Sequence, residues 1–377
     1  MNKLNEPLIH VFVMNKTLFR TFAAASLVTW DTTCSAQSVT LYGELDTGLA
    51  YVNNVGGHAQ YRATSGLIDG SYWGLQGTED LGSGMKALFR LERGYSVASG
   101  EELNDHPAYV GLQSDTLGTL TLGHQYDLIH DYFAPFTLTG GTGGTAFAHP
   151  FDNDNANNSY LAANSVKYVS DSFGGFTVGG MYAFSNDAGR FAQNRAYGIG
   201  VNYANGPFNA SVAWMHDNGR GQTQSGVYDP SALPGGDRAI VDVSAEEHDV
   251  IATGASYSIG DVTIAGAWSR SIYTGVADAQ SGDVLAAIAF SNYEVSAVWQ
   301  ATPSIAVAGM YVFTDASSAH WHQGALQVVY QLSKRTDVYA ETIYQRASSG
   351  APAVINTNDP SSSRSQLLVA TGIRHRF

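Results

Sequence analysis

Apolar and polar residues alternate with a period of two through most of the chain from residue 38 to the end. In the last dozen residues, Leu367, Val369 and Ile373 share one face, whereas Gln366 and Arg374 share the other. This alternation predicts β-strands whose two faces meet unlike surroundings. Sixteen segments carry the pattern: Ser38–Val52, Tyr72–Thr78, Lys86–Tyr95, Ala108–Gln113, Thr119–Gln125, Asn164–Ser170, Phe176–Phe184, Tyr197–Tyr203, Phe208–His216, His248–Ile259, Val262–Ile272, Ser291–Gln300, Ile305–Thr314, Trp321–Leu332, Thr336–Gln345 and Gln366–Phe377.

Short turns and long polar loops alternate between these segments. Gly260-Asp261 is a short turn, whereas Tyr126 to Asn158 is a long connection after the fifth segment. An even number of strands of about ten residues, with short turns on one side and long loops on the other, is typical of an outer-membrane barrel. A secreted β-sandwich also alternates, but the strand length, the regular asymmetry of the connections and a chain that ends on Phe377 within a strand favour the barrel.

The amino end is expected to be a signal peptide, residues 1–36, followed by one barrel domain, residues 37–377. Lys16 and Arg20 precede an apolar stretch, and Cys34-Ser35-Ala36 matches the small-x-small cleavage pattern. Met14 lies closer to this basic region than Met1 does and is an alternative start. The single cysteine lies before the cleavage point, so we expect secretion without disulfide bonds.

The net charge and the motifs of the chain argue against several classes of function. The formal net charge of −14 argues against a nucleic-acid partner. An enzyme is disfavoured because neither a Gly-x-Ser-x-Gly elbow nor a His-Glu-x-x-His zinc motif occurs, and we expect no cofactor and no metal. His320 and His322 are expected on one face of a strand, where two histidines could bind a metal ion weakly. A place in an interfacial aromatic belt around Trp321 is favoured.

Several short motifs resemble those of the Gram-negative general porins, most of all the β-proteobacterial type. They are Ser38-Val39-Thr40-Leu41-Tyr42-Gly43, Gly77-Thr78-Glu79-Asp80-Leu81-Gly82, Ala108-Tyr109-Val110-Gly111-Leu112, Phe147-Ala148-His149-Pro150-Phe151-Asp152-Asn153-Asp154 and Arg374-His375-Arg376-Phe377. The resemblance implies a homotrimer of sixteen-stranded barrels in the outer membrane. Each barrel would hold a water-filled pore narrowed by an inward-folded third loop, and the terminal Phe377 would be an assembly signal.

The resemblance also implies a constriction with one basic wall facing acidic loop residues, and this chain departs from that pattern. Glu44 stands where the first strand often carries a lysine, and His124 replaces a common arginine. Strand alternation places His124 outside, so an inward position would require a bulge near Gly123. The predicted lumen or constriction residues are Glu44, Asp46, Tyr72, Gln76, Lys86, Arg90, Glu92, Tyr109, His124 and Lys167. The predicted acidic residues of the constriction loop are Asp127, Asp131, Asp152 and Asp154.

Because the basic wall is depleted, we expect a general channel for ions and small hydrophilic solutes that prefers cations. Its other expected partners are outer-membrane lipids and lipopolysaccharide. Two alternatives stay open. One is a solute-specific channel in which Tyr42, Tyr72 and Tyr109 stack against sugars. The other is a surface binding protein or adhesin that uses the polar stretch from Asp217 to Glu247.

Overall fold

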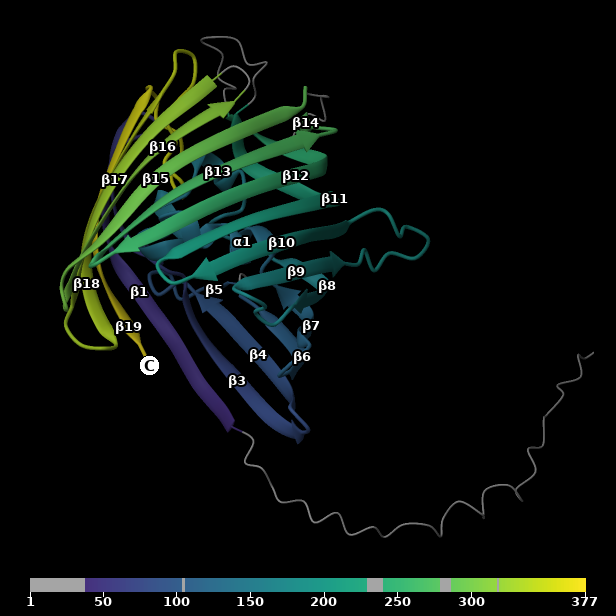
Figure 1. Cartoon of the computed structure of the whole chain (residues 1–377). Helices are drawn as coiled ribbons and strands as arrows, with labels where there is room; N and C mark the ends of the chain where they lie inside the picture. Colours follow the sequence, from purple (N-terminus) through teal and green to yellow (C-terminus); the bar gives the residue numbers. More distant parts are fainter. Residues whose placement is uncertain (1–37, 104–105, 229–239, 279–285, 317–318) are drawn as a thin grey trace, which may run out of the picture. The chain divides into compact units, whose positions relative to one another are not determined.

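The computed structural model describes residues 38–103, 106–228, 240–278, 286–316 and 319–377. The expected signal peptide, residues 1–36, lies outside the described residues. One sheet of antiparallel strands accounts for nearly all of the regular structure (Figure 1). Among the described residues, no helix is both long and apolar enough to cross a membrane.

The strands follow the chain order and pair with their sequence neighbours. They are β1 (Ser38–Val55), β2 (His58–Ser65), β3 (Ser71–Gly82), β4 (Met85–Tyr95), β5 (Glu102–Leu103), β6 (Ala108–Ser114), β7 (Gly118–Gln125), β8 (Ala162–Val169), β9 (Phe176–Ala183), β10 (Arg195–Asn205), β11 (Phe208–Tyr228), β12 (Ile240–Ile259), β13 (Val262–Thr274), β14 (Ala277–Asp278), β15 (Ile288–Thr302), β16 (Ile305–Ala316), β17 (Ala319–Gln331), β18 (Thr336–Ala347) and β19 (Ser365–Arg376).

The sheet closes on itself because the first and last strands pair. Glu44 of β1 lies opposite Arg376 of β19, and the ladder continues to Val52 opposite Leu368. The short strands β2, β5 and β14 extend neighbouring strands within the loops, which leaves sixteen strands around the described barrel. The prediction of a sixteen-stranded antiparallel barrel is confirmed.

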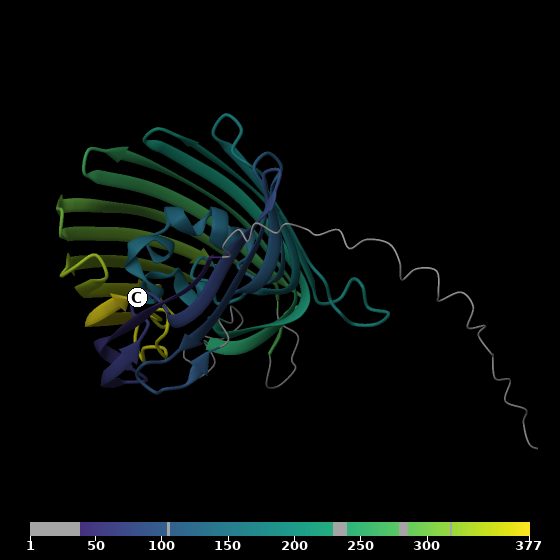
Figure 2. The ribbon, with the colours of Figure 1, turned by 90° about the horizontal axis from the view of Figure 1, so that it is seen from below.

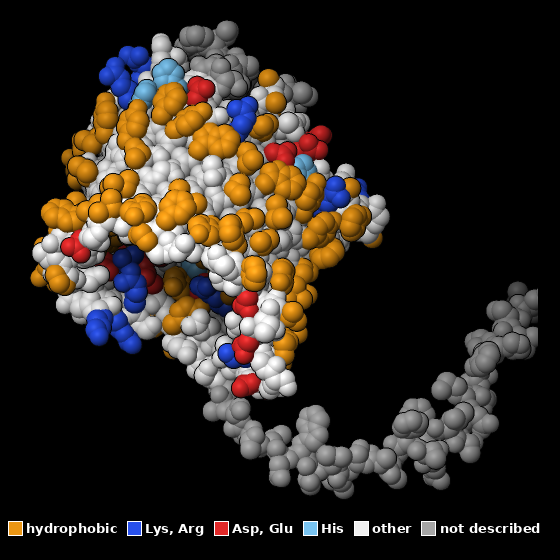
Figure 3. All heavy atoms as spheres, viewed as in Figure 1, with side chains coloured by type: hydrophobic (Ala, Val, Ile, Leu, Met, Phe, Trp, Pro, Cys, Tyr) orange, Lys and Arg blue, Asp and Glu red, His pale blue; other side chains and the backbone are white. Residues whose placement is uncertain are grey.

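The alternation of the sequence separates an apolar outer face from a mixed inner face. On β1, Leu41, Leu45 and Leu49 are exposed, whereas Asp46 and Ala50 on the opposite face are buried. Figure 3 shows hydrophobic side chains spread over the outer surface of the strands and a hollowed mouth with charged side chains inside it. Such an outer band suits contact with lipid.

At the loop end of the barrel, the structure has one strand that was not predicted and two strands that are longer than predicted. The segment His58–Ser65, expected to be loop, is the strand β2 and pairs with the extended end of β1. Strands β11 and β12 likewise continue to Tyr228 and from Ile240, through much of the stretch predicted as a long loop. Beyond the membrane the strand faces no longer meet unlike surroundings, so polar residues there can form strands without showing the alternation.

Candidate functional site

The connection between β7 and β8, residues 126–161 and here called the inner loop, lies against the inner face of the barrel. Figure 2 shows its short helical segments inside the ring of strands. It contains α1 (Leu128–Tyr132), η1 (Ala134–Phe136), η2 (Thr139–Gly143), η3 (Thr145–Phe147) and η4 (Pro150–Asp152).

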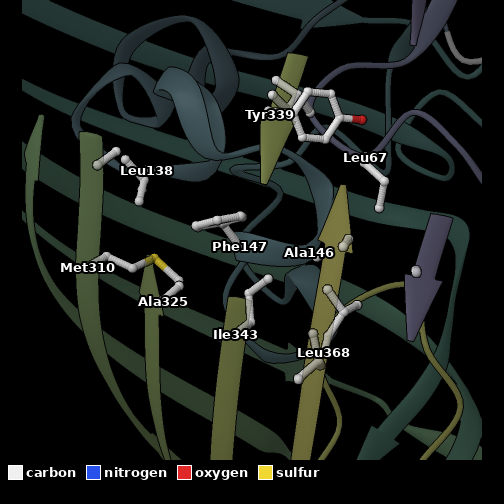
Figure 4. Packing of buried hydrophobic residues seen from close by; sticks show 14 of the residues in the cluster. Leu67, Leu138, Ala146, Phe147, Met310, Ala325, Tyr339, Ile343 and Leu368 are labelled. Atoms are coloured by element: carbon white, nitrogen blue, oxygen red, sulfur yellow. The ribbon is translucent and has the colours of Figure 1, made fainter. Parts of the chain in front are cut away.

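Glycines of the wall make room for the aromatic residues of the inner loop. A Cβ atom at Gly179 or Gly200 would lie within 3 Å of the Tyr132 ring, and one at Gly254 would meet Phe136 in the same way. On another part of the wall, Phe147 packs among buried apolar residues that include Ile343 and Leu368 (Figure 4). Close packing on separated wall segments therefore holds the loop inside the barrel.

A buried histidine connects the inner loop to β15. The Nδ1 atom of His149 lies 2.7 Å from Asp154, and its Nε2 atom lies 3.2 Å from Glu294. The backbone N–H of Leu138 donates to the other oxygen of Glu294 at 2.6 Å. Burial opposes a charge on His149, but Asp154 and Glu294 outweigh it and raise its pKa to about 10. At neutral pH the imidazolium is therefore a cation between two carboxylates.

The predicted loop carboxylates hold the loop together. Asp127 caps α1 by accepting the His130 N–H at 2.8 Å, and Asp152 accepts the N–H groups of Asn157 at 2.8 Å and Ser159 at 3.1 Å. Burial raises the pKa of Asp127 to about 6. Burial, helped by the charge of Asp154, raises the pKa of Asp152 to about 7. Asp127, Asp152 and Asp154, predicted as acidic residues of the constriction loop, all lie in the inner loop, where each is buried and bonded within the loop or to the wall. Their effect on the pore stays a prediction.

A cavity of about 420 Å³ remains between the inner loop, the wall and the segment before β3. Of the predicted lumen residues, Tyr72 and Arg90 line it. The other lining residues are Asp69, Gly70, His106, Tyr126, His130, Thr139, Gly140, Gly141, Thr145, Ala156, Asn157, Asn158 and Ser159. The lining is mostly uncharged and polar, which suits water and small hydrophilic solutes.

Each predicted cation of the wall has a carboxylate beside it. The Arg90 guanidinium donates to Glu92 at 2.7 Å and to the hydroxyl of Tyr42 at 3.0 Å. Lys167 lies 2.6 Å from Asp131. Lys86 lies 4.0 Å from Asp115 near the short turns, and both side chains are exposed. Their fields are therefore partly cancelled at short range.

The turn end of the barrel carries a second charged group, here called the mouth cluster: Glu44, Asp337, Arg374 and Arg376. Arg376 lies 2.7 Å from Glu44 and 3.2 Å from Asp337. Arg374 lies 3.2 Å from Asp337 and 3.7 Å from Glu44. Glu44 thus forms part of an ion-pair network, which sequence reasoning about Glu44 alone missed.

The strand register decides which face of the barrel the remaining predicted lumen residues occupy. Gln76 and Tyr109 lie opposite Arg90 on the neighbouring strands, so they share its inner face. His124 lies opposite Ala108 and shares the parity of the exposed Leu120 and Leu122. The expected irregularity near Gly123 exists, but the extra residue belongs to β8, where Asn164 has a φ of +54°. The register thus argues against a lumen position for His124.

His320 and His322 have their ring centroids 5.5 Å apart on the outer face of β17. The Tyr311 hydroxyl lies 2.6 Å from Nδ1 of His322. No group of three or more His, Cys, Asp or Glu side chains in the described ranges is arranged to hold a metal ion. Both rings lie near Phe313, whereas Trp321, around which the belt was expected, is buried on the opposite face of β17.

Sequence reasoning missed Asp69, His106, Tyr126 and His130 in the cavity. They lie in loops, where no periodicity marks an inward side chain. The arginines of the mouth cluster did carry a signal, because Arg374 and Arg376 alternate with Ile373, His375 and Phe377 on the other face of the last strand.

A family model described as Gram-negative porin matches residues 22–350. An outer membrane porin protein of Bordetella pertussis is 29% identical, over 97% of this chain and 100% of its own. Outer membrane porin protein 32 of Delftia acidovorans is 28% identical over the same shares. Among solved structures, an anion-selective porin from Comamonas acidovorans has 26% identity and a TM-score of 0.74, covering 90% of this chain and 100% of its own. The trimer form of OmpT of Vibrio cholerae has 18% identity and a TM-score of 0.64, covering 91% and 100%.

Proposed function

We propose that the pore of this chain, which belongs to the Gram-negative porin family, prefers cations. Members of this family are outer-membrane channels and not enzymes. General diffusion of ions and small hydrophilic solutes follows from the family. The sign of the selectivity depends on which charges line this pore.

The observation that carries the proposal is the pairing of the wall cations. Arg90 bonds to Glu92, Lys167 bonds to Asp131, and the two arginines of the mouth cluster face Glu44 and Asp337. Asp69 lines the cavity and takes part in none of these four bridges. With the cations offset and a carboxylate left in this cavity, which we take as the narrow region of the pore, the field favours cation entry.

The Comamonas porin is described as anion-selective. Its likeness to this chain supports a shared barrel, whereas selectivity depends on individual side chains that 26% identity leaves largely different. The proposal for this chain therefore rests on its own charges.

The test is the reversal potential of the refolded protein in a planar bilayer under a tenfold KCl gradient. We expect stepwise openings with a cation-signed potential. An anion-signed potential would overturn the cation preference and leave the porin unchanged.

We also propose that the barrel forms a homotrimer. The outer faces of β1, β2 and β19 form an apolar groove of about 480 Å³ lined by residues that include Leu49, Tyr61 and Val369, and Tyr61 is 80% exposed. The OmpT structure, which is a trimer form, supports the same assembly for this fold. Native mass spectrometry should give three copies, and a monomer under the same detergent would contradict this.

Contact with lipopolysaccharide is proposed for the loop end of β17 and β18. The exposed Arg346 lies opposite His322 on the outer face, above the apolar side chains Leu326 and Val328. A cation at the edge of an apolar band suits a lipid phosphate. Arg346→Gln should weaken binding to lipopolysaccharide vesicles, and unchanged binding would contradict the assignment.

We propose that residues 1–36 are removed on export. N-terminal sequencing of the mature protein should start at Gln37.

A further inference from the structure

A short segment between β2 and β3, residues 66–70 and here called the hook, reaches the same cavity as the inner loop. Leu67 and Ile68 are buried on the inner face of the barrel, in one apolar cluster with Ala50, Ala146 and Phe147. Figure 4 shows Leu67 among the side chains of this cluster. Asp69 follows them and is exposed in the cavity. The narrow region is therefore built by two loops.

A single buried carboxylate fixes the backbone of the hook. One oxygen of Asp46 accepts the N–H of Ile68 at 2.7 Å and the N–H of Asp69 at 3.0 Å, and the other accepts the hydroxyl of Tyr339. The backbone carbonyl of Asp46 accepts the Gly66 N–H at 3.0 Å and the Ser71 hydroxyl at 3.0 Å. The first residue of the hook and the residue that follows it, Ser71 of β3, are thus bonded to one residue of β1.

The inner loop holds the hook from the other side. Thr145 donates its N–H to the carbonyl of Leu67 at 3.1 Å and its hydroxyl to the carbonyl of Gly66 at 3.0 Å. The neighbouring Gly144 has a φ of +95°, and a Cβ there would lie 2.2 Å from the Leu67 carbonyl oxygen. Only glycine permits this approach.

Asp69 meets a mixed set of charges at this point. Its environment holds His106 beside Gly70, the guanidinium of Arg374 and the carboxylate of Asp46. Across the same cavity lie Arg90, which is bonded to Glu92, and His130. The faces of Tyr72 and Tyr126 complete the polar lining. Among the described residues that line this cavity, Asp69 is the one that carries a carboxylate.

We infer that Asp69 is the specificity-determining residue of the narrow region and that Asp46 is the positioning residue that presents it. This inference rests on the proposed cation preference and extends it to a solute class. Small solutes that carry an ammonium group are favoured over those that carry a carboxylate, because a carboxylate and aromatic faces attract ammonium groups.

The first test replaces the charge. Asp69→Asn should lower the potassium-to-chloride permeability ratio by about twofold or more, and Asp69→Lys should lower it further, because each removes negative charge from a narrow, poorly screened region. The ratio of ethanolammonium to potassium permeability should fall as well. Asp261→Asn is the matched control, since it makes the same change in an exposed turn between β12 and β13.

An Asp69→Asn pore that folds, conducts and keeps the wild-type permeability ratio would overturn the inference. Failure of the proposed function would look different. A wild-type pore without cation preference would contradict the proposed function, whereas the difference in permeability ratio between wild type and Asp69→Asn would still test the role of Asp69.

The second test releases the hook without altering Asp69. Asp46→Ala removes the acceptor of the Ile68 and Asp69 N–H groups, so the hook should leave its place, single-channel conductance should rise and the cation preference should fall. Asp46→Asn keeps one acceptor oxygen and should restore part of both. Equal permeability ratios in wild type and a folded Asp46→Ala pore would contradict the positioning role.

Discussion

At the scale of single residues, the charges of this pore act in bonded pairs, and His149 is the clearest case. Its ring is fully buried between Asp154 and Glu294. A buried ion pair contributes little net stability, but removing one partner leaves an uncompensated charge. His149 therefore controls whether the inner loop can stay on β15.

We predict that His149→Gln loosens the inner loop and increases current noise and protease sensitivity. The loss of a charged partner costs about 3 kcal/mol in such sites. The pKa of His149 is raised from 6.5 to about 10, so its stabilising charge is complete below pH 6.5 and is lost as pH rises through about 10. Wild-type noise should increase between pH 9 and 11, whereas the variant should be noisy throughout. A quiet variant would contradict the role of His149.

At the scale of elements, the alternating sequence predicts the membrane-facing part of each strand well, because lipid on one side and polar contents on the other impose the period. It does not predict β2 or the outer ends of β11 and β12, where water meets both faces. The alternation does not predict the fold of the inner loop either. Its acids, such as Asp127 and Asp152, look like pore charges in the sequence but accept backbone N–H groups in the fold.

The inner loop should make the selectivity depend on pH. The pKa values of Asp127 and Asp152 are raised to about 6 and about 7, and His149 stays charged below about pH 10. Between pH 8 and pH 5 the loop therefore gains protons and loses negative charge, so the cation preference should fall. Reversal potentials at pH 5, 6, 7 and 8 measure this. Asp152→Asn should flatten the profile, and an unchanged slope would place Asp152 outside the ion field.

At the scale of the whole molecule, closure of the barrel brings together residues from opposite ends of the chain. Arg376 meets Glu44 and Tyr339 meets Asp46 across this seam. Alternation predicts that each of these residues faces inward, but the sequence holds no sign of which residues become partners. The fold could therefore be predicted from the sequence, whereas the charge balance of the pore could not.

The seam also offers a test of the role proposed for the terminal residue. The Phe377 ring lies over Gly43 of β1, where a Cβ would come within 2.5 Å of it. Gly43→Val should press on this ring and on the Tyr72 carbonyl oxygen, which lies 2.6 Å from the same Cβ, and should lower the yield of the heat-modifiable folded form on unheated gels. Gly324→Val is the matched control, because a Cβ there meets nothing within 4 Å. Wild-type yield from Gly43→Val would contradict a role for this contact in assembly.

The bond between Asp46 and Tyr339 joins β1 to β18, with β19 between them. Since the other oxygen of the same Asp46 carboxylate fixes the hook, the filter that we propose is not complete before the cylinder is shut. Biogenesis therefore has a built-in order, in which discrimination arises last. A cell that inserted unfinished barrels would suffer an indiscriminate leak, so folding fidelity and the permeability barrier of the envelope depend on the same few atoms.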